Sequence, residues 1–243
     1  MTKPWLAFNF YSAATLSHKP LIAISACLHG EAVRYDGTAK KLLLLSELAE
    51  TVDLYPVCPE VGAGMAIPRP PIQLQKQTNV IAAIGRDDST LDMTTALQQY
   101  APRSIAAVEH RLSGYIFKSR SPSCGVESTP LFDPQGQTIG LTSGIQAKYI
   151  QTTLPWLPLR EEQQLATPEQ CQQFIMHCLI MQDLINGYNH AGAEKLNQHY
   201  SPLQSRFNVS QRKQLDAERN QPDSYWQLFS EALAGLELET ITN

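Results

Sequence analysis

Long apolar runs are missing from this sequence of 243 residues. No stretch approaches the roughly 20 consecutive apolar residues that a membrane-spanning helix needs, so we expect no association with a membrane. The N-terminal segment from Trp5 to Leu16 is modestly apolar, but Asn9 and Ser12 interrupt it and only Lys3 precedes it. It is shorter and weaker than the apolar region of a secretory signal peptide, and we therefore predict a cytoplasmic protein.

Cysteines are too few and too unevenly spaced for a disulfide scaffold. The chain has 5 of them, whereas small secreted domains that depend on disulfides are much richer in cysteine. The odd count also leaves at least one thiol unpaired. Reduced thiols in a cytoplasmic protein are the better interpretation.

An excess of positive charge is also absent, because the formal net charge is -4. Residues 1–150 carry 13 Lys or Arg against 12 Asp or Glu, whereas residues 151–243 carry 6 against 11. The acidic C-terminal part argues against an arm that binds nucleic acid, although local basic patches remain compatible with this composition.

Short apolar runs alternate with helical patterns in the first two thirds of the chain. Strands are predicted at 21–28, 53–58 and 114–117, and the first is almost continuously apolar, as in a strand covered on both faces. Helices are predicted at 42–52 and 91–112, the second with a break or kink at Pro102. This β-α-β-α-β order favours an α/β fold with a mostly parallel, Rossmann-like central sheet flanked by helices.

The chain divides into three parts on this interpretation. Residues 1–19 form an irregular N-terminal lead-in, residues 20–165 the α/β domain, and residues 166–243 an all-helical C-terminal extension. Helices in the extension are predicted from Pro168 to near Gly187, then at 191–200, 210–220 and 223–234. Cys171 and Cys178 share one face of the first of these helices, so we interpret them as core residues.

Three cysteines lie at corresponding points of the predicted strands. Cys27 and Cys58 close the first two strands, and Cys124 follows the third within the hydroxyl-rich loop Lys118–Gly125. Because the carboxyl ends of parallel strands meet at one edge of a sheet, we expect the three thiols to lie together. We interpret them as one metal or cluster site, although a single free cysteine is more typical of a packed core.

The residue types do not decide which metal or cluster the three cysteines would bind. Thiolates are soft ligands that select zinc, copper(I) or iron–sulfur clusters. A structural zinc site normally has a fourth protein ligand, and His29 is the histidine nearest to Cys27 in the sequence. Three cysteines around a four-iron cluster would instead leave one iron open to an atom of the substrate.

Polar side chains accompany the three thiols. Glu60 follows Cys58 by two residues and is a candidate general acid or base. Of Ser121 and Ser123, we expect one to bond the loop backbone and the other to polarise a substrate, and the residue types do not decide which. Four cations are interpreted as neutralising an anionic cluster or binding an anionic or carbonyl-bearing substrate, with loop bracing as the alternative: Arg34, Arg69, Lys118 and Arg120.

Three motifs, in this order, resemble those of the thiouracil desulfidase family, which was long known only as a domain of unknown function. They are Ile24–Leu28 with Val33–Gly37, then Val57–Val61 with Pro68–Pro70, and finally Lys118–Gly125. The resemblance covers about residues 20–165. It implies an α/β fold and a [4Fe–4S] cluster ligated by three cysteines, which correspond to Cys27, Cys58 and Cys124.

The resemblance also implies an activity. Members of the family carry out a non-redox, hydrolytic cleavage of the C–S bond that releases sulfide from a thiolated pyrimidine such as 2-thiouracil. The catalytic carboxylate of the family falls on Glu60 and its catalytic serine on Ser121. The remaining motif residues are then expected to bind substrate or to surround the cluster: Arg34, Tyr35, Asp36, Arg69, Lys118 and Ser123.

The C-terminal extension departs from the family pattern. Minimal members end near the end of the α/β domain, and others carry a larger helical domain associated with demodification of 4-thiouridine in tRNA, whose motifs residues 166–243 do not match. We therefore favour a small thiolated pyrimidine as partner, with tRNA less favoured. A non-catalytic iron–sulfur or zinc-binding protein is the alternative from another class. The sequence does not define the oligomeric state.

Overall fold

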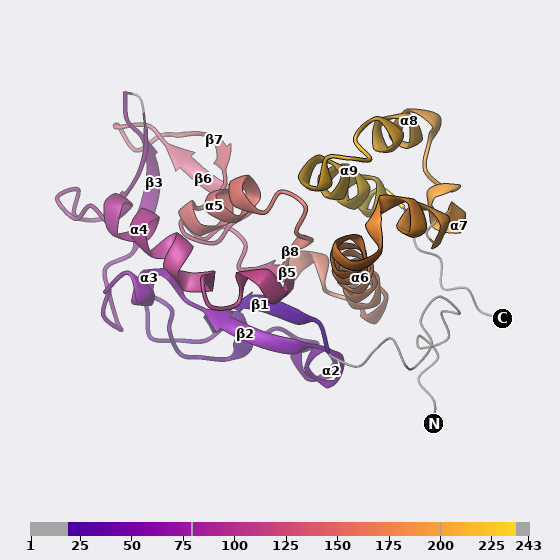
Figure 1. The fold of residues 1–243 in the computed structure, drawn as a ribbon. Helices are drawn as coiled ribbons and strands as arrows, with labels where there is room; N and C mark the ends of the chain where they lie inside the picture. Colours follow the sequence, from indigo (N-terminus) through magenta and orange to yellow (C-terminus); the bar gives the residue numbers. More distant parts are fainter. Residues whose placement is uncertain (1–18, 79, 200, 237–243) are drawn as a thin grey trace.

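The computed structural model describes residues 19–78, 80–199 and 201–236 of the chain (Figure 1). The predicted lead-in lies almost wholly outside these residues. Figure 1 shows a central sheet with a second sheet on one side of it and the C-terminal helices on the other. This arrangement confirms the predicted α/β class with a helical C-terminal part.

The central sheet, called sheet A here, has four strands that all run parallel. Its strands in spatial order are β2 (Asp53–Val57), β1 (Leu21–Ser25), β5 (Leu112–Phe117) and β8 (Leu159–Glu161). Strands β1 and β5 are buried along their whole length, as their nearly continuous apolar sequences predict for strands that are covered on both faces. Strand β8, with three residues, was not predicted.

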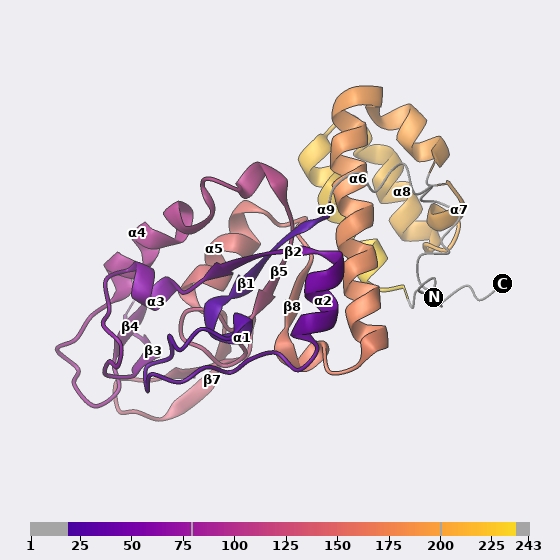
Figure 2. The same ribbon diagram turned by 90° about the horizontal axis from the view of Figure 1, so that it is seen from below.

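Helices cover both faces of sheet A (Figure 2). On one face Ala23 and Tyr115 share a core cluster with residues of α4 and α5, and on the other Ile22 and Ile116 share one with residues of α2 and α6. The helices of the α/β part are α1 (Ala26–His29), α2 (Leu45–Thr51), α3 (Pro59–Gly62), α4 (Thr94–Ile105) and α5 (Ile145–Thr153), with short 3₁₀ turns η2 (Glu109–Arg111) and η3 (Glu162–Gln164).

A second, mixed sheet, called sheet B here, was not predicted as a separate unit. It is built from two antiparallel hairpins that join through a parallel pair, β3 with β6. Its strands in spatial order are β4 (Ile81–Gly85), β3 (Ile72–Lys76), β6 (Thr129–Phe132) and β7 (Thr138–Thr142). One hairpin lies between β2 and β5 in the chain and the other between β5 and β8, so sheet B is assembled from two insertions into sheet A.

Two predicted strand ends were wrong in detail. The first strand stops at Ser25, and Cys27 lies in the one-turn helix α1. The second strand stops at Val57, and Glu60 lies in α3, which starts with Pro59. Proline at the first helical position has its φ angle already set for a helix and has no N–H to satisfy, so a helix can start directly after the strand.

Two predicted helix breaks were also wrong. Helix α4 runs through Pro102 and ends only at Ile105, because a proline near the C-terminal end of a helix removes one hydrogen bond without separating two long segments. Helix α6 (Pro168–His199) continues through Gly187. A single glycine inside a helix costs only about 1 kcal/mol relative to alanine, which the packing of a long helix outweighs.

The C-terminal helices form their own core. Phe207, Leu215, Tyr225 and Phe229 are buried in a cluster that joins α6 to the helices after it. These helices are α7 (Ser201–Gln204), α8 (Val209–Ala217) and α9 (Pro222–Ala234). The prediction of α8 and α9 is confirmed, whereas α7 was not predicted.

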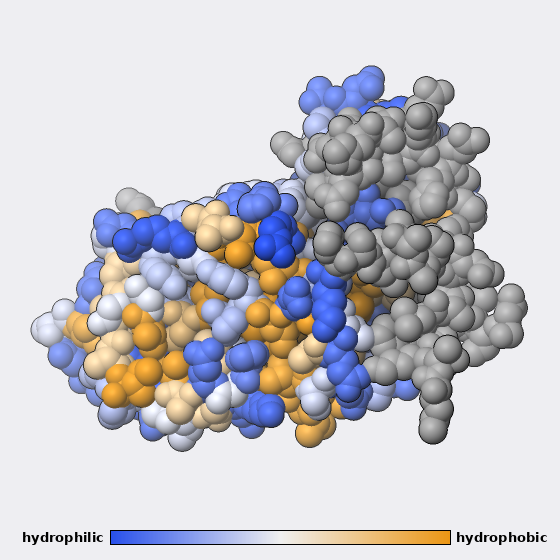
Figure 3. Space-filling view, turned by 60° about the horizontal axis from the view of Figure 1, so that its bottom comes forward, coloured by the Kyte–Doolittle hydropathy of each residue, from blue (hydrophilic) through white to orange (hydrophobic). Residues whose placement is uncertain are grey.

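No helix in the described part of the chain is long and apolar enough to cross a membrane. On the face drawn in Figure 3, hydrophobic residues lie in small groups among hydrophilic ones over the α/β part.

Helix α6 approaches sheet A at Gly114 in the middle of β5. A Cβ atom at this position would lie 2.5 Å from Cys178 Sγ and 3.0 Å from Phe174 Cζ, both on α6. We therefore expect Gly114→Ala to lower the free energy of unfolding by about 1–3 kcal/mol through overpacking. Urea unfolding measures this change. Gly235→Ala is the matched control, because its Cβ would have no neighbour closer than 3.6 Å. An equal effect of the two substitutions would contradict this packing.

The core of the C-terminal helices contains a buried histidine, His177, which hydrogen-bonds Ser230 at 3.0 Å. Burial, with a contribution from the Arg160 guanidinium, lowers the pKa of His177 from 6.5 to about 3. Below pH 6.5 the unfolded chain therefore binds a proton that the folded chain does not. The free energy of unfolding should therefore fall as the pH falls from 6.5 to about 3, by about 1.4 kcal/mol per pH unit for this group.

We expect His177→Gln to reduce this acid sensitivity. Urea unfolding at about pH 7 and about pH 5 gives the difference, since the unfolded-state pKa of histidine lies between them. His110→Gln, at an exposed position, should keep the wild-type pH dependence. An unchanged dependence in His177→Gln would show that this histidine does not set it.

Candidate functional site

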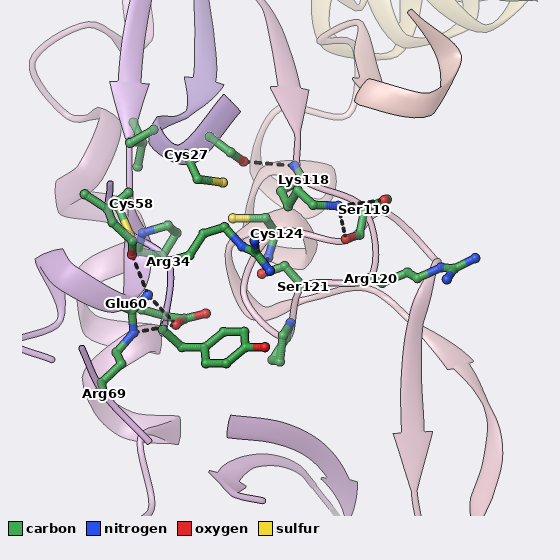
Figure 4. Close-up of a pocket in the computed structure, with 17 residues that line it drawn as sticks. Cys27, Arg34, Cys58, Glu60, Arg69, Lys118, Ser119, Arg120, Ser121 and Cys124 are labelled. Carbon is green, nitrogen blue, oxygen red and sulfur yellow. Dashed lines mark hydrogen bonds and ion pairs between the residues drawn. The ribbon is translucent and has the colours of Figure 1, made fainter. Parts of the chain in front are cut away.

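A cavity of about 290 Å³ lies at the carboxyl edge of sheet A (Figure 4). Each of the predicted strands contributes to it through the segment that follows the strand. Its walls are Ser25–Cys27 at the end of β1, the segment 57–60 at the end of β2, the segment 33–35, Arg69, and residues 118–122 and 124 after β5. The structure therefore brings the ends of the three predicted strands together at a single cavity.

Three free thiols line this cavity: Cys27 in α1, Cys58 at the N-cap of α3, and Cys124 in the loop after β5. Figure 4 shows the sulfur atoms of Cys27 and Cys124 turned towards the same space. Cys124 is only 5% exposed, whereas Cys27 and Cys58 are partly exposed. Cys171 and Cys178 are buried in the core, as predicted.

Burial raises the pKa of all three cavity thiols. For Cys27 desolvation and then the neighbouring Cys58 raise the pKa to about 11. The pKa of Cys58 is raised mainly by desolvation, and that of Cys124 is raised furthest, again mainly by desolvation. The thiols are therefore protonated at neutral pH unless a metal group displaces the protons, and uptake of such a group would release them.

The three thiols come from different segments and line one shared space, an arrangement that suits an iron–sulfur cluster. A [4Fe–4S] cluster binds each thiolate to a different iron and so requires thiols around a shared space rather than around one point. Three soft ligands around one cavity meet that requirement.

Glu60 is held by two partners on the cavity wall. Its Oε2 atom accepts a hydrogen bond from Arg69 Nε at 2.8 Å and lies 2.7 Å from Arg69 Nη2 in an ion pair. Its Oε1 atom accepts from the hydroxyl of Ser123 at 3.1 Å. Arg69 also donates to the carbonyl of Val33 at 2.9 Å, and its side chain is 4% exposed. The carboxylate is thus fixed in direction by an ion pair and a hydrogen bond.

The two candidate serines have different contacts. Ser121 lines the cavity, and its Oγ accepts from the backbone N–H groups of Ser123 and Cys124 at 3.3 and 3.2 Å. Ser123 is fully buried, donates to Glu60, and accepts through its carbonyl from Gln146 N and Ala147 N in α5. Both serines therefore support the loop, but through different groups, and Ser121 is the one beside the cavity.

Lys118 contributes to the cavity wall, but its ammonium group is occupied. It donates to Glu162 and to both the carbonyl and the hydroxyl of Ser119. Desolvation raises the pKa of Glu162, but the hydrogen bonds from Lys118 and Ser119 outweigh it and the net pKa lies below its usual value. This carboxylate is consequently charged at neutral pH and pairs with Lys118.

The remaining predicted site residues are divided between the cavity wall and its surroundings. Arg34 donates to Thr38, lies 3.7 Å from Asp36, and stacks over the ring of Tyr35. Arg34, Tyr35 and Arg120 line the cavity, whereas Asp36 and Ser123 do not. The Arg120 side chain has no ion pair among the residues that the structure describes.

Sequence reasoning missed three contributors to this region. Ser25 lines the cavity and accepts from Lys118 N at 2.9 Å, and Ser119 and Glu162 form the network around Lys118. Glu162 lies 43 and 44 residues from its partners. The signal in the sequence was the pair of acidic residues Glu161 and Glu162 directly after an apolar segment. Such a pair does not predict which distant residues it will contact.

The fold and cavity together define an α/β protein with three thiols converging at the carboxyl edge of a parallel sheet. Comparison with known proteins gives the family: residues 22–162 match the family model for 2-thiouracil desulfurase. This match spans more than half of the chain, which therefore belongs to that family, as its motifs indicated. It ends at residue 162 and does not include α6 to α9.

Two individual proteins are also similar to parts of this chain. The uncharacterized protein YbbK of Bacillus subtilis (strain 168) is 30% identical over 114 residues, which are 43% of this chain and 73% of that protein. Among solved structures, the [4Fe-4S]-dependent thiouracil desulfidase TudS is similar, with 27% identity and a TM-score of 0.49 over 60% of this chain and 93% of that chain.

The buried Glu60–Arg69 pair predicts a large effect of Arg69→Met on stability. The substitution would leave the Glu60 carboxylate and the Val33 carbonyl without their guanidinium donors. Breaking a buried pair in this way should lower the free energy of unfolding by about 3 kcal/mol. Urea unfolding of the full chain measures the loss.

Arg86→Met is the matched control, because Arg86 pairs with Asp87 on the surface, where both side chains are more than half exposed. We expect no change in its unfolding midpoint, since exposed ion pairs contribute little. Equal midpoints for Arg69→Met and wild type would show that the buried pair does not stabilise the fold.

Proposed function

We propose that this protein removes sulfur from a thiolated pyrimidine such as 2-thiouracil, with a [4Fe–4S] cluster ligated by Cys27, Cys58 and Cys124. One observation carries the proposal. Three thiols that lie far apart in the sequence line one cavity together with a fixed carboxylate and a serine hydroxyl, in a chain that belongs to the 2-thiouracil desulfurase family.

The reaction is an exchange of sulfur for oxygen without electron transfer. Water adds to the thiocarbonyl carbon, its oxygen stays as the carbonyl oxygen, and the sulfur leaves as hydrogen sulfide with the two protons of that water. When bound by three cysteines, a [4Fe–4S] cluster supplies one iron without a protein ligand, which is a Lewis acid with affinity for sulfur.

Glu60 is proposed to take up the proton of the attacking water. Arg69 holds one of its oxygens and Ser123 holds the other. The carboxylate therefore keeps a fixed direction relative to the cavity. A general base is effective when it is held within hydrogen-bond reach of the proton that it accepts. Glu60 then returns this proton to the leaving sulfur, and its hydrogen bond from Arg69 keeps the carboxyl group in place throughout.

Ser121 is proposed to orient the substrate. Its oxygen already accepts two backbone N–H groups, so its own proton remains available to donate to a polar atom of the ring. A hydroxyl oriented by backbone donors cannot rotate freely, which favours a single substrate orientation. Tyr35, at the opening, offers an aromatic face against which a pyrimidine can stack.

The first test concerns the carboxylate. We expect Glu60→Gln to lower kcat for 2-thiouracil by about 10² to 10⁴, the usual contribution of general acid–base catalysis, while the iron content of the reconstituted protein stays at the wild-type level. Loss of thione absorbance under anaerobic conditions follows the reaction. Glu109→Gln is the control, because Glu109 precedes β5 at the opposite edge of sheet A. Wild-type turnover in Glu60→Gln would remove Glu60 from the mechanism.

The same assay separates the candidate substrates. Release of sulfide from 2-thiouracil or 4-thiouridine supports a small-molecule enzyme, whereas release only from thiolated tRNA, with binding that weakens steeply as salt rises, indicates a tRNA substrate. Tightly held zinc without sulfide release from any of the three would favour the non-catalytic alternative.

A further inference from the structure

Two consecutive carboxylates at the end of β8 contact the loop that carries Cys124. We call residues 118–128 the Cys124 loop. Glu161 closes β8, and Glu162 begins the 3₁₀ turn η3. Neither residue lines the cavity, and neither has a part in the proposed chemistry.

Glu162 fastens the first part of the Cys124 loop. Its Oε2 atom accepts from the backbone N–H of Ser119 at 2.7 Å, and its Oε1 atom accepts from the Ser119 hydroxyl at 2.8 Å and from the Lys118 ammonium. The next residue, Gln163, adds a hydrogen bond from its side-chain nitrogen to the Ser119 hydroxyl at 2.8 Å. The Glu162 side chain is 15% exposed, so water does not readily replace these contacts.

Glu161 fastens the second part of the loop. Its Oε1 atom accepts from the backbone N–H of Val126 at 2.7 Å and from the hydroxyl of Ser128. The residue is 9% exposed and pairs with Phe117 across sheet A. The loop is therefore held by carboxyl acceptors on both sides of Cys124.

Helix α6 fixes the position of these carboxylates. Leu165, just after η3, is fully buried in the same core cluster as Phe174 and Cys178 of α6. Phe174 and Cys178 lie against Gly114 in β5, the strand that leads into the Cys124 loop. The first turns of the C-terminal extension thus pack on the strand before the loop, while the residues just ahead of them bind the loop itself.

We propose that Glu161 and Glu162 are positioning residues that keep Cys124 and Ser121 turned into the cavity, and that the docking of α6 on β5 keeps these carboxylates in place. Their importance for turnover rests on the proposed function. Their effect on the loop does not, because it concerns only contacts within the chain.

Alkylation of thiols in the full chain prepared without metal tests the proposal, with each cysteine followed by mass spectrometry. In Glu162→Gln one carboxylate oxygen becomes an NH₂ group, which faces the Lys118 ammonium. We expect the alkylation rate of Cys124 to rise about tenfold, as loss of a charged hydrogen-bond partner implies, and that of Cys178, which is fully buried in α6, to stay unchanged. Glu161→Gln should act in the same direction.

Two further variants separate positioning from a general loss of stability. Glu162→Asp keeps the charge and should restore part of the protection of Cys124. Glu169→Gln, in the first turn of α6 at an exposed position, should leave every rate unchanged. The proposal is overturned if Cys124 stays as protected as in the wild type, or if Cys124 and Cys178 are exposed in parallel.

The proposed function is tested separately from the positioning role of the two carboxylates. A wild-type protein that releases no sulfide from thiolated pyrimidines refutes the function and leaves the alkylation result standing. With an active wild type, Glu162→Gln should retain less iron after reconstitution than Glu169→Gln. Full iron retention together with unchanged Cys124 alkylation counts against the positioning role.

Discussion

The parallel alignment of β2, β1 and β5 is the constraint on which the site depends. In a parallel sheet every strand ends at the same edge, so segments that follow different strands are brought together without any contact between their own residues. Cys27, Cys58 and Cys124 meet at this edge because each follows its strand by a few residues. A shift of any strand, or a reversal of its direction, would carry its thiol away from the cavity.

Two ion pairs hold the wall of the cavity around the thiols. Arg69 is matched by Glu60, and Lys118 by Glu162. The Lys118–Glu162 pair joins segments 44 residues apart, whereas the Glu60–Arg69 pair joins α3 to the segment that follows it, and each fixes a loop as well as a charge. Most of the positive charge near the thiols is structural in this protein, which limits how much of it is available to bind an anionic substrate.

The sequence was most informative where a residue type and a strand end coincide. The three thiols and Glu60 could be placed at one sheet edge because apolar strands and their carboxyl ends are visible as local patterns, whereas the choice of Ser121 over Ser123 came only from the family resemblance. The strand pairing that forms sheet B could not be predicted, because it joins two hairpins inserted at distant points of the chain. The contacts of Glu162 were missed for the same reason, since both partners lie more than 40 residues away. The helix breaks expected at Pro102 and Gly187 were wrong, because Pro102 lies close to the end of α4 and a single glycine costs a long helix little.

The central claim is that three thiols hold one cluster, and iron and sulfide content after anaerobic reconstitution tests it most directly. The account predicts about four iron and four sulfide per chain, as a [4Fe–4S] cluster requires. It also predicts a marked loss of both in the Ser variants of Cys27, Cys58 and Cys124, with no loss in Cys178→Ser. Bound zinc without sulfide, or an intact cluster in any of the three cavity variants, would contradict it.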